Sequence, residues 1–163
     1  EIIKDYFKDG SFMDVNIEYV YEENPLGTRG ALGLLSQDIS NKPMIVINGD
    51  ILTSMDFNKL IDYHNSNNSL ATVVVRDYEL KIPYGVVESK NLKITDIVEK
   101  PSYKYFVNAG IYVLNPEIYL SVNKDEKIDM PDLLKRHLDK NKNSIYPIHE
   151  YWSDIGSKED FEK

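Results

Sequence analysis

The sequence contains no cysteine among its 163 residues, which excludes disulfide bonds, zinc sites built from thiolates and thiol nucleophiles. It also lacks any apolar run approaching the ~20 residues that a membrane-spanning helix needs. The first five residues are charged and amphipathic, unlike a secretory signal. These absences predict a cytoplasmic protein that does not bind membranes.

Basic residues are outnumbered, because 19 Lys and Arg stand against 27 Asp and Glu and give a net charge of −8. Nucleic acids and anionic membranes are bound by basic surfaces that displace counterions, so neither is an expected partner. A nucleotide ligand is still compatible with this charge, since a cation bound at one site overrides the global sign there. The hydrophobic share of 42% and the charged share of 28% are typical of a globular domain.

The first half of the chain alternates strand-like and helix-like patterns. Short apolar or alternating runs indicate strands, whereas apolar residues at helical spacing indicate helices. Strands are predicted at residues 15–20, 44–47 and 70–75, and helices at 31–35, capped by Thr28, and at 55–67. This β-α-β-α-β rhythm predicts a parallel sheet covered by helices.

The second half changes character, because its strand patterns are separated by turns rather than by long helices. These strands are predicted at residues 84–88, 92–99 and 106–114, and helices at 116–120, from Pro131 to about 141 and from Ser157 onward. The turns indicate a more antiparallel lobe beside the main sheet. No internal repeat or linker divides the chain, so residues 1–163 are expected to form one domain.

Two aspartates are candidate ligands for a divalent cation. Asp50 follows a buried strand in the tripeptide Asn48-Gly49-Asp50, and ligands of open α/β sheets collect at the carboxyl ends of strands. Asp154 lies two residues after Trp152, the single tryptophan of the sequence. Two carboxylates together with substrate phosphates are a common way to hold Mg²⁺. The alternatives are that Asn48-Gly49-Asp50 is a turn in which Asp50 caps the next helix, and that Trp152 packs into the core with Asp154 near the start of the following helix. Spacing alone does not bring the two aspartates together.

Two further segments could contact phosphate, sugar or base. In Glu99-Lys100-Pro101 the proline is expected to hold Lys100 extended, so that its ammonium neutralises a phosphate while Glu99 accepts bonds from sugar hydroxyls. The alternative is an ordinary exposed ion pair. Gly27 and Thr28 lie in a glycine-bearing turn whose backbone amides could read a base edge, although the spacing is not that of a P-loop or a dinucleotide fingerprint.

Taken together and in this order, the segments resemble the sugar-1-phosphate nucleotidyltransferases, also called nucleoside-diphosphate-sugar pyrophosphorylases. Within that family they most resemble the branch of the mannose-1-phosphate guanylyltransferases and their bacterial relatives. The matching segments are residues 17–23, Pro25-Leu26-Gly27-Thr28, Asn48-Gly49-Asp50, Pro83-Tyr84-Gly85-Val86-Val87, Glu99-Lys100-Pro101, residues 107–112 and Trp152-Ser153-Asp154-Ile155-Gly156.

The resemblance implies a Rossmann-like, GT-A-like α/β domain with a mixed, mainly parallel sheet flanked by helices. It implies that a nucleotidyl group passes from a nucleoside triphosphate, with GTP mildly favoured, to a sugar 1-phosphate, giving a nucleoside-diphosphate sugar and pyrophosphate with the help of Mg²⁺. By position, the implied metal ligands are Asp50 and Asp154, the phosphate-binding lysine is Lys100, the sugar contacts are Gly85, Glu99 and Asn108, and the base contacts are Gly27 and Thr28.

The family's glycine-rich opening, GxGTRLxPLT followed by a lysine, lies upstream of Glu1 in this comparison. We therefore expect a domain truncated before its phosphate-binding loop, inactive or nearly so by itself, with exposed sheet edges that favour self-association. Arg29 stands where the family commonly has a small residue, and it could contact the nucleotide or point to solvent. The alternative function is a non-catalytic regulatory subunit that binds a nucleotide sugar, but the presence of both aspartates favours the enzyme.

Overall fold

A computed structural model describes residues 2–22, 25–28, 30–35, 41–124, 126–138 and 142–156. The chain divides into two compact units, which are described separately. Unit 1 comprises Glu1–Lys42 and Asn115–Lys140, and unit 2 comprises Pro43–Leu114 and Asn141–Lys163. Within the described ranges, no helix has both the length and the apolar character needed to cross a membrane.

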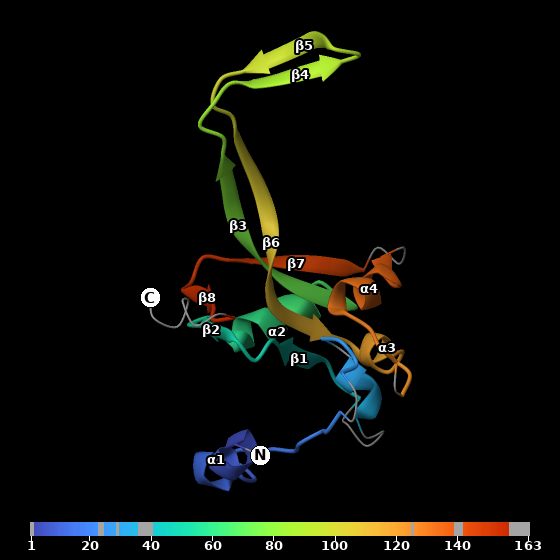
Figure 1. Ribbon diagram of the computed structural model, residues 1–163. Helices are drawn as coiled ribbons and strands as arrows, with labels where there is room; N and C mark the ends of the chain where they lie inside the picture. The colour runs from blue at the N-terminus through green and yellow to red at the C-terminus, as the bar shows by residue number, and fades with distance from the viewer. Residues whose placement is uncertain are drawn as a thin grey trace. The chain divides into compact units, whose positions relative to one another are not determined.

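The main sheet belongs to unit 2 and has the strand order β1-β6-β3-β7 (Figure 1). Its strands are β1 (Met44–Ile47), β3 (Ala71–Lys81), β6 (Ser102–Leu114) and β7 (Asn143–Ile148). Both β1 and β3 pair antiparallel with β6, and β7 pairs parallel with β3. Three of the four strands thus run in one direction, which confirms the expected mixed α/β fold.

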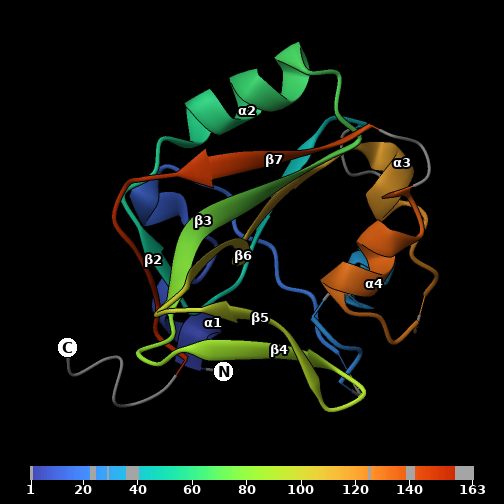
Figure 2. The ribbon, with the colours of Figure 1, turned by 90° about the horizontal axis from the view of Figure 1, so that it is seen from above.

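Helix α2 (Phe57–Ser66) packs against one face of the main sheet, where it contacts β6 and β7 (Figure 2). Asp56 begins it, because this carboxylate accepts hydrogen bonds from the backbone amides of Asn58 (2.9 Å) and Lys59 (3.4 Å). Leu60 is fully buried against the sheet. The core of unit 2 consists of Met55, Leu60, Val74, Ala109, Ile111, Val113 and Ile148. The predicted helix at 55–67 is thus confirmed, and its apolar spacing decides which face is buried.

A chain of polar side chains connects α2 to the sheet. The Nδ1 of buried His64 lies 2.8 Å from the hydroxyl of Thr72, which lies 2.9 Å from the hydroxyl of Ser144. That hydroxyl in turn lies 2.8 Å from the Ser69 hydroxyl. Because these four side chains, His64, Thr72, Ser144 and Ser69, are hydrogen-bonded to one another, the network fixes how α2, β3 and β7 meet.

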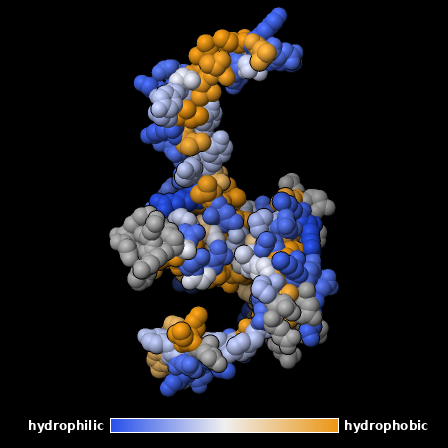
Figure 3. All heavy atoms as spheres, viewed as in Figure 1, coloured by the Kyte–Doolittle hydropathy of each residue, from blue (hydrophilic) through white to orange (hydrophobic). Residues whose placement is uncertain are grey.

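Strands β3 and β6 continue past the main sheet as a two-stranded arm, residues 76–81 paired with 102–107. A hairpin of β4 (Val86–Lys90) and β5 (Lys93–Val98) follows at the end of the arm (Figure 1). These antiparallel strands are the ones predicted from the second half of the sequence. Apolar residues gather along the arm and hairpin in Figure 3, and their side chains are largely exposed.

Unit 2 also contains a small sheet that the sequence pattern does not predict. Strand β2 (Ile51–Thr53) pairs antiparallel with β8 (Trp152–Asp154), so that Ile51 lies opposite Asp154. Each strand has only three residues, which is too short to show a hydrophobic period.

Unit 1 consists of short helices and extended segments. The helices are α1 (Ile2–Phe7), η1 (Ser11–Met13), η2 (Gly30–Leu34), α3 (Pro116–Tyr119) and α4 (Met130–Lys135). The helix expected at 31–35 is a 3₁₀ helix, η2. The helix expected from Ser157 falls outside the described residues, as does Arg29.

The strand predicted at residues 15–20 is wrong, because this segment is not part of any sheet. Its apolar and polar residues do alternate, but a strand is stabilised by ladder hydrogen bonds to a neighbour. Nothing in the part of the chain that the structure describes supplies that neighbour, and Val15 and Val20 remain 50% and 44% exposed.

Replacing Thr72 with valine tests the polar network. The change keeps the shape of the side chain but leaves His64 and Ser144 without their shared hydroxyl, so we expect a loss of about 1–3 kcal/mol in the free energy of unfolding. Urea denaturation measures it, with the exposed Thr95→Val on β5 as the matched control. Equal stabilities of the two variants would contradict the assigned network.

Candidate active site

The turn that carries Asp50 rests on an irregularity of β6. The pairing of β3 with β6 shifts register between Val73 and Val75, opposite the bulged residues that include Gly110. Gly110 has φ +73°, and a Cβ there would lie 2.9 Å from Nδ2 of Asn48. Its carbonyl accepts a hydrogen bond of 2.9 Å from the Asn48 amide. Glycine suits this position because its φ is left-handed and because the Asn48 side chain lies too close to leave room for a Cβ.

The same bulge anchors the segment that carries the second aspartate. The indole Nε1 of Trp152 donates a hydrogen bond of 2.8 Å to the carbonyl of Ala109. The carbonyl of Trp152 accepts a bond of 2.9 Å from Nη1 of Arg76, whose guanidinium lies 5.7 Å from the centre of the indole ring. Trp152 is therefore held at its side chain by β6 and at its backbone by β3.

These anchors bring Asp50 and Asp154 together, although they are far apart in the sequence. The Ile155 amide donates a hydrogen bond of 2.8 Å to the Asp50 carbonyl. A Cβ built on Gly156 would lie 3.0 Å from Oδ1 of Asp154 and 3.8 Å from Oδ2 of Asp50, so the two carboxylates converge on one point. Both side chains are exposed, and the lack of a side chain on Gly156 leaves that point open.

The chemistry of this pair fits a hard divalent cation. Within the described ranges, neither carboxylate has an ion-pair or hydrogen-bond partner, so two like charges face each other without a counterion. No third acidic or histidine side chain joins them in that part of the chain. Mg²⁺ is commonly held by one or two carboxylates, with water and substrate phosphates completing its shell. Asp50 and Asp154 could therefore hold Mg²⁺ together with a phosphorylated substrate.

Gly85, Glu99 and Lys100 meet at the base of the hairpin. A Cβ on Gly85 would lie 3.0 Å from Oε2 of Glu99, so glycine leaves space beside this carboxylate. Nζ of Lys100 lies 3.9 Å from Oε1 of Glu99, and the two side chains are 68% and 73% exposed. Such an exposed pair contributes little to stability, which leaves both groups accessible to a ligand.

The expectation that Lys100 is extended is wrong, because its φ is +45°. The chain must pass within three residues from Val98, the last residue of β5, to Ser102, the first of β6, and these strands belong to different sheets. A hydrogen bond of 3.1 Å from the Ile82 amide to the Pro101 carbonyl extends the pairing of β3 with β6 up to this connection. Strand pairing on both sides thus overrides the local preference that a following proline imposes.

Asn108 lies in the bulge rather than at the hairpin. Its Oδ1 accepts a hydrogen bond of 2.9 Å from the Gly110 amide, and its Nδ2 donates to the hydroxyl of Tyr112. Asn108 is thus close to the Asn48 turn, but it lies six positions along β6 from Ser102, a span of about 20 Å in an extended strand. The structure therefore brings Asn108 near the aspartate turn and leaves Glu99 and Lys100 in a second cluster.

Gly27 and Thr28 belong to unit 1, where they pack against the start of α4. The Thr28 amide donates a hydrogen bond of 2.9 Å to Oδ1 of Asp129, and the Thr28 hydroxyl accepts one of 3.3 Å from the Met130 amide. Gly27 has φ +83°, and a Cβ there would lie 2.8 Å from the same Asp129 oxygen. Asp129 thus fixes the glycine turn, a role that sequence reasoning missed because the two segments are remote in the chain.

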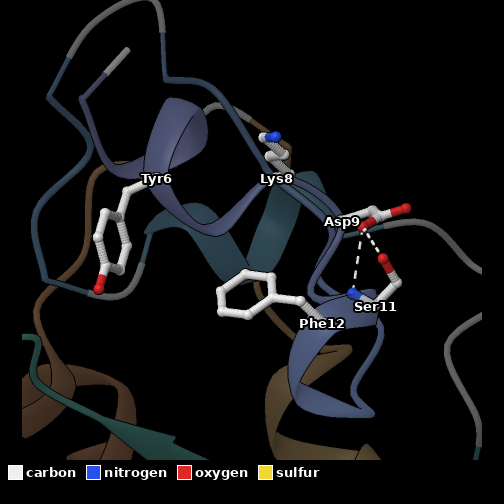
Figure 4. Close-up of a pocket in the computed structure, with 5 residues that line it drawn as sticks. All are labelled: Tyr6, Lys8, Asp9, Ser11 and Phe12. Atoms are coloured by element: carbon white, nitrogen blue, oxygen red, sulfur yellow. Dashed lines mark hydrogen bonds between the residues drawn. The ribbon is translucent and has the colours of Figure 1, made fainter.

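Two cavities of unit 1 are lined by residues that do not include any of the predicted site residues. One of about 430 Å³ is drawn in Figure 4 and is lined by Tyr6, Lys8, Asp9, Ser11 and Phe12. There Asp9 accepts hydrogen bonds from the hydroxyl (2.8 Å) and amide (3.1 Å) of Ser11, which lower the pKa of its carboxyl. Another, of about 510 Å³, lies between η2 and the loop after α3.

Comparison with known proteins gives one consistent result. A family model described as nucleotidyl transferase matches residues 1–163. The chain is 35% identical over 159 residues to a mannose-1-phosphate guanyltransferase of Yarrowia lipolytica, which covers 90% of the chain and 42% of that protein. It is 31% identical to the D-glycero-α-D-manno-heptose 1-phosphate guanylyltransferase of Campylobacter jejuni, over 99% of the chain and 71% of that protein.

Among solved structures, HddC from Yersinia pseudotuberculosis complexed with GMP-PN is similar, with a TM-score of 0.61 and 26% identity. The match covers 97% of the chain and 71% of HddC. The first curated relatives are matched over only 42% and 41% of their length, so the chain spans less than half of those proteins.

Replacing Gly110 with alanine tests the bulge. An alanine at this position would have to keep a left-handed backbone, and its Cβ would clash with the side-chain amide of Asn48. We therefore expect a loss of about 1–2 kcal/mol or more in the free energy of unfolding. The matched control is Gly49→Ala, where no atom lies within 4 Å of the added Cβ, and a change within about 0.5 kcal/mol is expected. If urea denaturation shows equal losses for both, the bulge does not constrain the turn.

Proposed function

Because this chain belongs to the nucleotidyl transferase family, we propose that the natural protein at full length transfers a nucleotidyl group from a nucleoside triphosphate to a sugar 1-phosphate. The products are a nucleoside-diphosphate sugar and pyrophosphate. The observation that carries the proposal is the convergence of the Asp50 and Asp154 carboxylates beside Gly156. We propose the cytoplasm as the place of the reaction, with its supply of nucleoside triphosphates.

In the proposed reaction, a phosphate oxygen of the sugar 1-phosphate forms a bond to the α-phosphorus of the triphosphate. The bond from the α-phosphorus to the oxygen that bridges it to the β-phosphorus breaks, and pyrophosphate leaves with the electron pair of that bond. The attacking phosphate has a second pKa near 6 and is mostly deprotonated at neutral pH, so no side chain has to act as a base. The work of the protein is therefore alignment and charge neutralisation.

Asp50 and Asp154 would hold Mg²⁺, which when bound supplies positive charge to the reacting phosphates. Lys100 would neutralise the phosphate of the sugar, and Glu99 would accept hydrogen bonds from sugar hydroxyls beside Gly85, which leaves room for the ring. Since Glu99 and Lys100 precede β6, and Asn108 lies about 20 Å along that strand from its first residue, the proposal requires the hairpin to bend toward the aspartates when the sugar binds.

Guanine is the proposed base. The proposal draws on two relatives, from Yarrowia lipolytica and Campylobacter jejuni, that bear the names of guanylyltransferases, and on the similar HddC, which was solved with GMP-PN. Gly27 and Thr28 are the proposed base contacts. The left-handed turn at Gly27, held by Asp129, presents its backbone in a fixed conformation.

Replacing Asp50 with asparagine removes one negative charge and keeps the shape of the side chain. We expect pyrophosphate release from GTP and a panel of sugar 1-phosphates to fall on the order of 100-fold or more, because the cation contributes several kcal/mol of charge stabilisation. The melting temperature should barely change, since the carboxylate is exposed and has no partner in the described residues.

The matched control is Asp62→Asn, which removes an exposed carboxylate from α2. Full turnover of Asp50→Asn together with a much lower melting temperature would mean that Asp50 is a structural turn residue. Tight binding of a GDP-sugar by the unmodified protein, with no pyrophosphate release from any combination of substrates, would instead indicate a regulatory subunit.

Replacing Lys100 with alanine tests the sugar-phosphate assignment. A charged hydrogen bond is worth about 1.5–3 kcal/mol, so the KM for the sugar 1-phosphate should rise about 10-fold or more. The KM for GTP should stay within about twofold, as for a surface substitution remote from the nucleotide. Steady-state kinetics measure both, with Lys90→Ala on the same hairpin as control. Equal increases in both KM values would refute the assignment.

A further inference from the structure

Arg76 of β3 is a cation that no predicted site accounts for. Its Nη1 donates a hydrogen bond of 2.9 Å to the Trp152 carbonyl, and its guanidinium lies 5.7 Å from the centre of the Trp152 ring. Within the described parts of the chain, no carboxylate forms an ion pair with it. Its positive charge is therefore directed at one residue, through the backbone and the ring at once.

Trp152 begins the three-residue strand that ends at Asp154. Among the residues that the structure describes, this strand pairs only with β2, itself three residues long, so the ladder alone holds it weakly. Two side-chain contacts supplement the ladder at Trp152: the indole bond to the Ala109 carbonyl (2.8 Å) and the Arg76 bond to the Trp152 carbonyl. Side chains two residues apart on a strand share a face, so Trp152 and Asp154 lie on the same face of this short strand.

We propose that Arg76 is a positioning residue for Asp154: by fixing both the carbonyl and the ring of Trp152, it holds the Asp154 carboxylate toward Asp50. The inference rests on the proposed metal role of the two aspartates. An arginine suits this position because one planar group donates a hydrogen bond and also faces an aromatic ring. Arg76 itself is not expected to contact a substrate.

The test uses the full-length natural protein and measures the binding of Mn²⁺ alone, from the electron paramagnetic resonance signal of free Mn²⁺. Removing a group that orients a metal ligand typically weakens metal affinity at least tenfold, so Arg76→Leu should raise the dissociation constant for Mn²⁺ about 10-fold. Arg76→Lys should restore most of the affinity, because its ammonium can donate to the same carbonyl. Lys81→Leu, which removes another exposed cation of β3, should leave the affinity within about twofold.

The fluorescence of Trp152 provides a second readout. Arg76→Leu should shift the emission of this residue, identified by subtracting the spectrum of Trp152→Phe, because the guanidinium no longer lies over the ring. Kinetically, the Mg²⁺ concentration for half-maximal pyrophosphate release should rise about 10-fold while the KM for GTP stays within about twofold. A role in stability alone would lower the melting temperature without this split.

Asp154→Asn, measured in parallel, separates this inference from the proposed function. If Asp154→Asn loses Mn²⁺ and Arg76→Leu binds it like the unmodified protein, Arg76 does not position Asp154 and the metal site stands. If Asp154→Asn also binds Mn²⁺ normally, the metal role is wrong and the inference falls with it. Should Arg76→Leu not fold, Arg76→Met, which also removes the guanidinium, takes its place, and unchanged Mn²⁺ binding by that variant would equally overturn the proposal.

Discussion

The left-handed backbone at Gly110 is the constraint on which the candidate site depends. Because Gly110 has no Cβ, the Asn48 side chain can pack directly against it, and this contact begins the turn that leads to Asp50. The neighbouring carbonyl of Ala109 receives the indole of Trp152, two residues before Asp154. One bulge in β6 therefore positions two segments from opposite ends of unit 2.

The sequence predicts what local physics decides. The strand at Met44–Ile47 and the helix at 55–67 appear where their patterns place them, because the spacing of apolar residues is a property of neighbours in the chain. The convergence of Asp50 and Asp154 could not be predicted in the same way. It follows from the register that sets Ile51 opposite Asp154, and three-residue strands carry too little pattern to reveal a register.

The errors have the same origin. The alternation at residues 15–20 predicts a strand, but a strand also requires a partner, and the pattern does not say whether one is present. Proline after Lys100 predicts an extended residue, yet β5 pairs with β4 and β6 pairs with β3, and the short connection between these two pairs gives Lys100 a positive φ in spite of that preference. Arg76 has no local signal at all. Its contact with Trp152 exists only because β3 passes beside β8 in the folded unit.

The geometry of the site must be held by groups other than the two carboxylates. Two exposed carboxylates that face one point repel each other, and no cation in the described parts of the chain neutralises them. Their mutual interaction therefore cannot hold them in place before a ligand arrives. The positions are fixed instead by contacts that do not involve the carboxylates: the Ile155 amide on the Asp50 carbonyl, the indole on Ala109 and the guanidinium on the Trp152 carbonyl. A site organised in this way keeps its charge uncompensated, and that charge is then available to a divalent cation and the phosphates it accompanies.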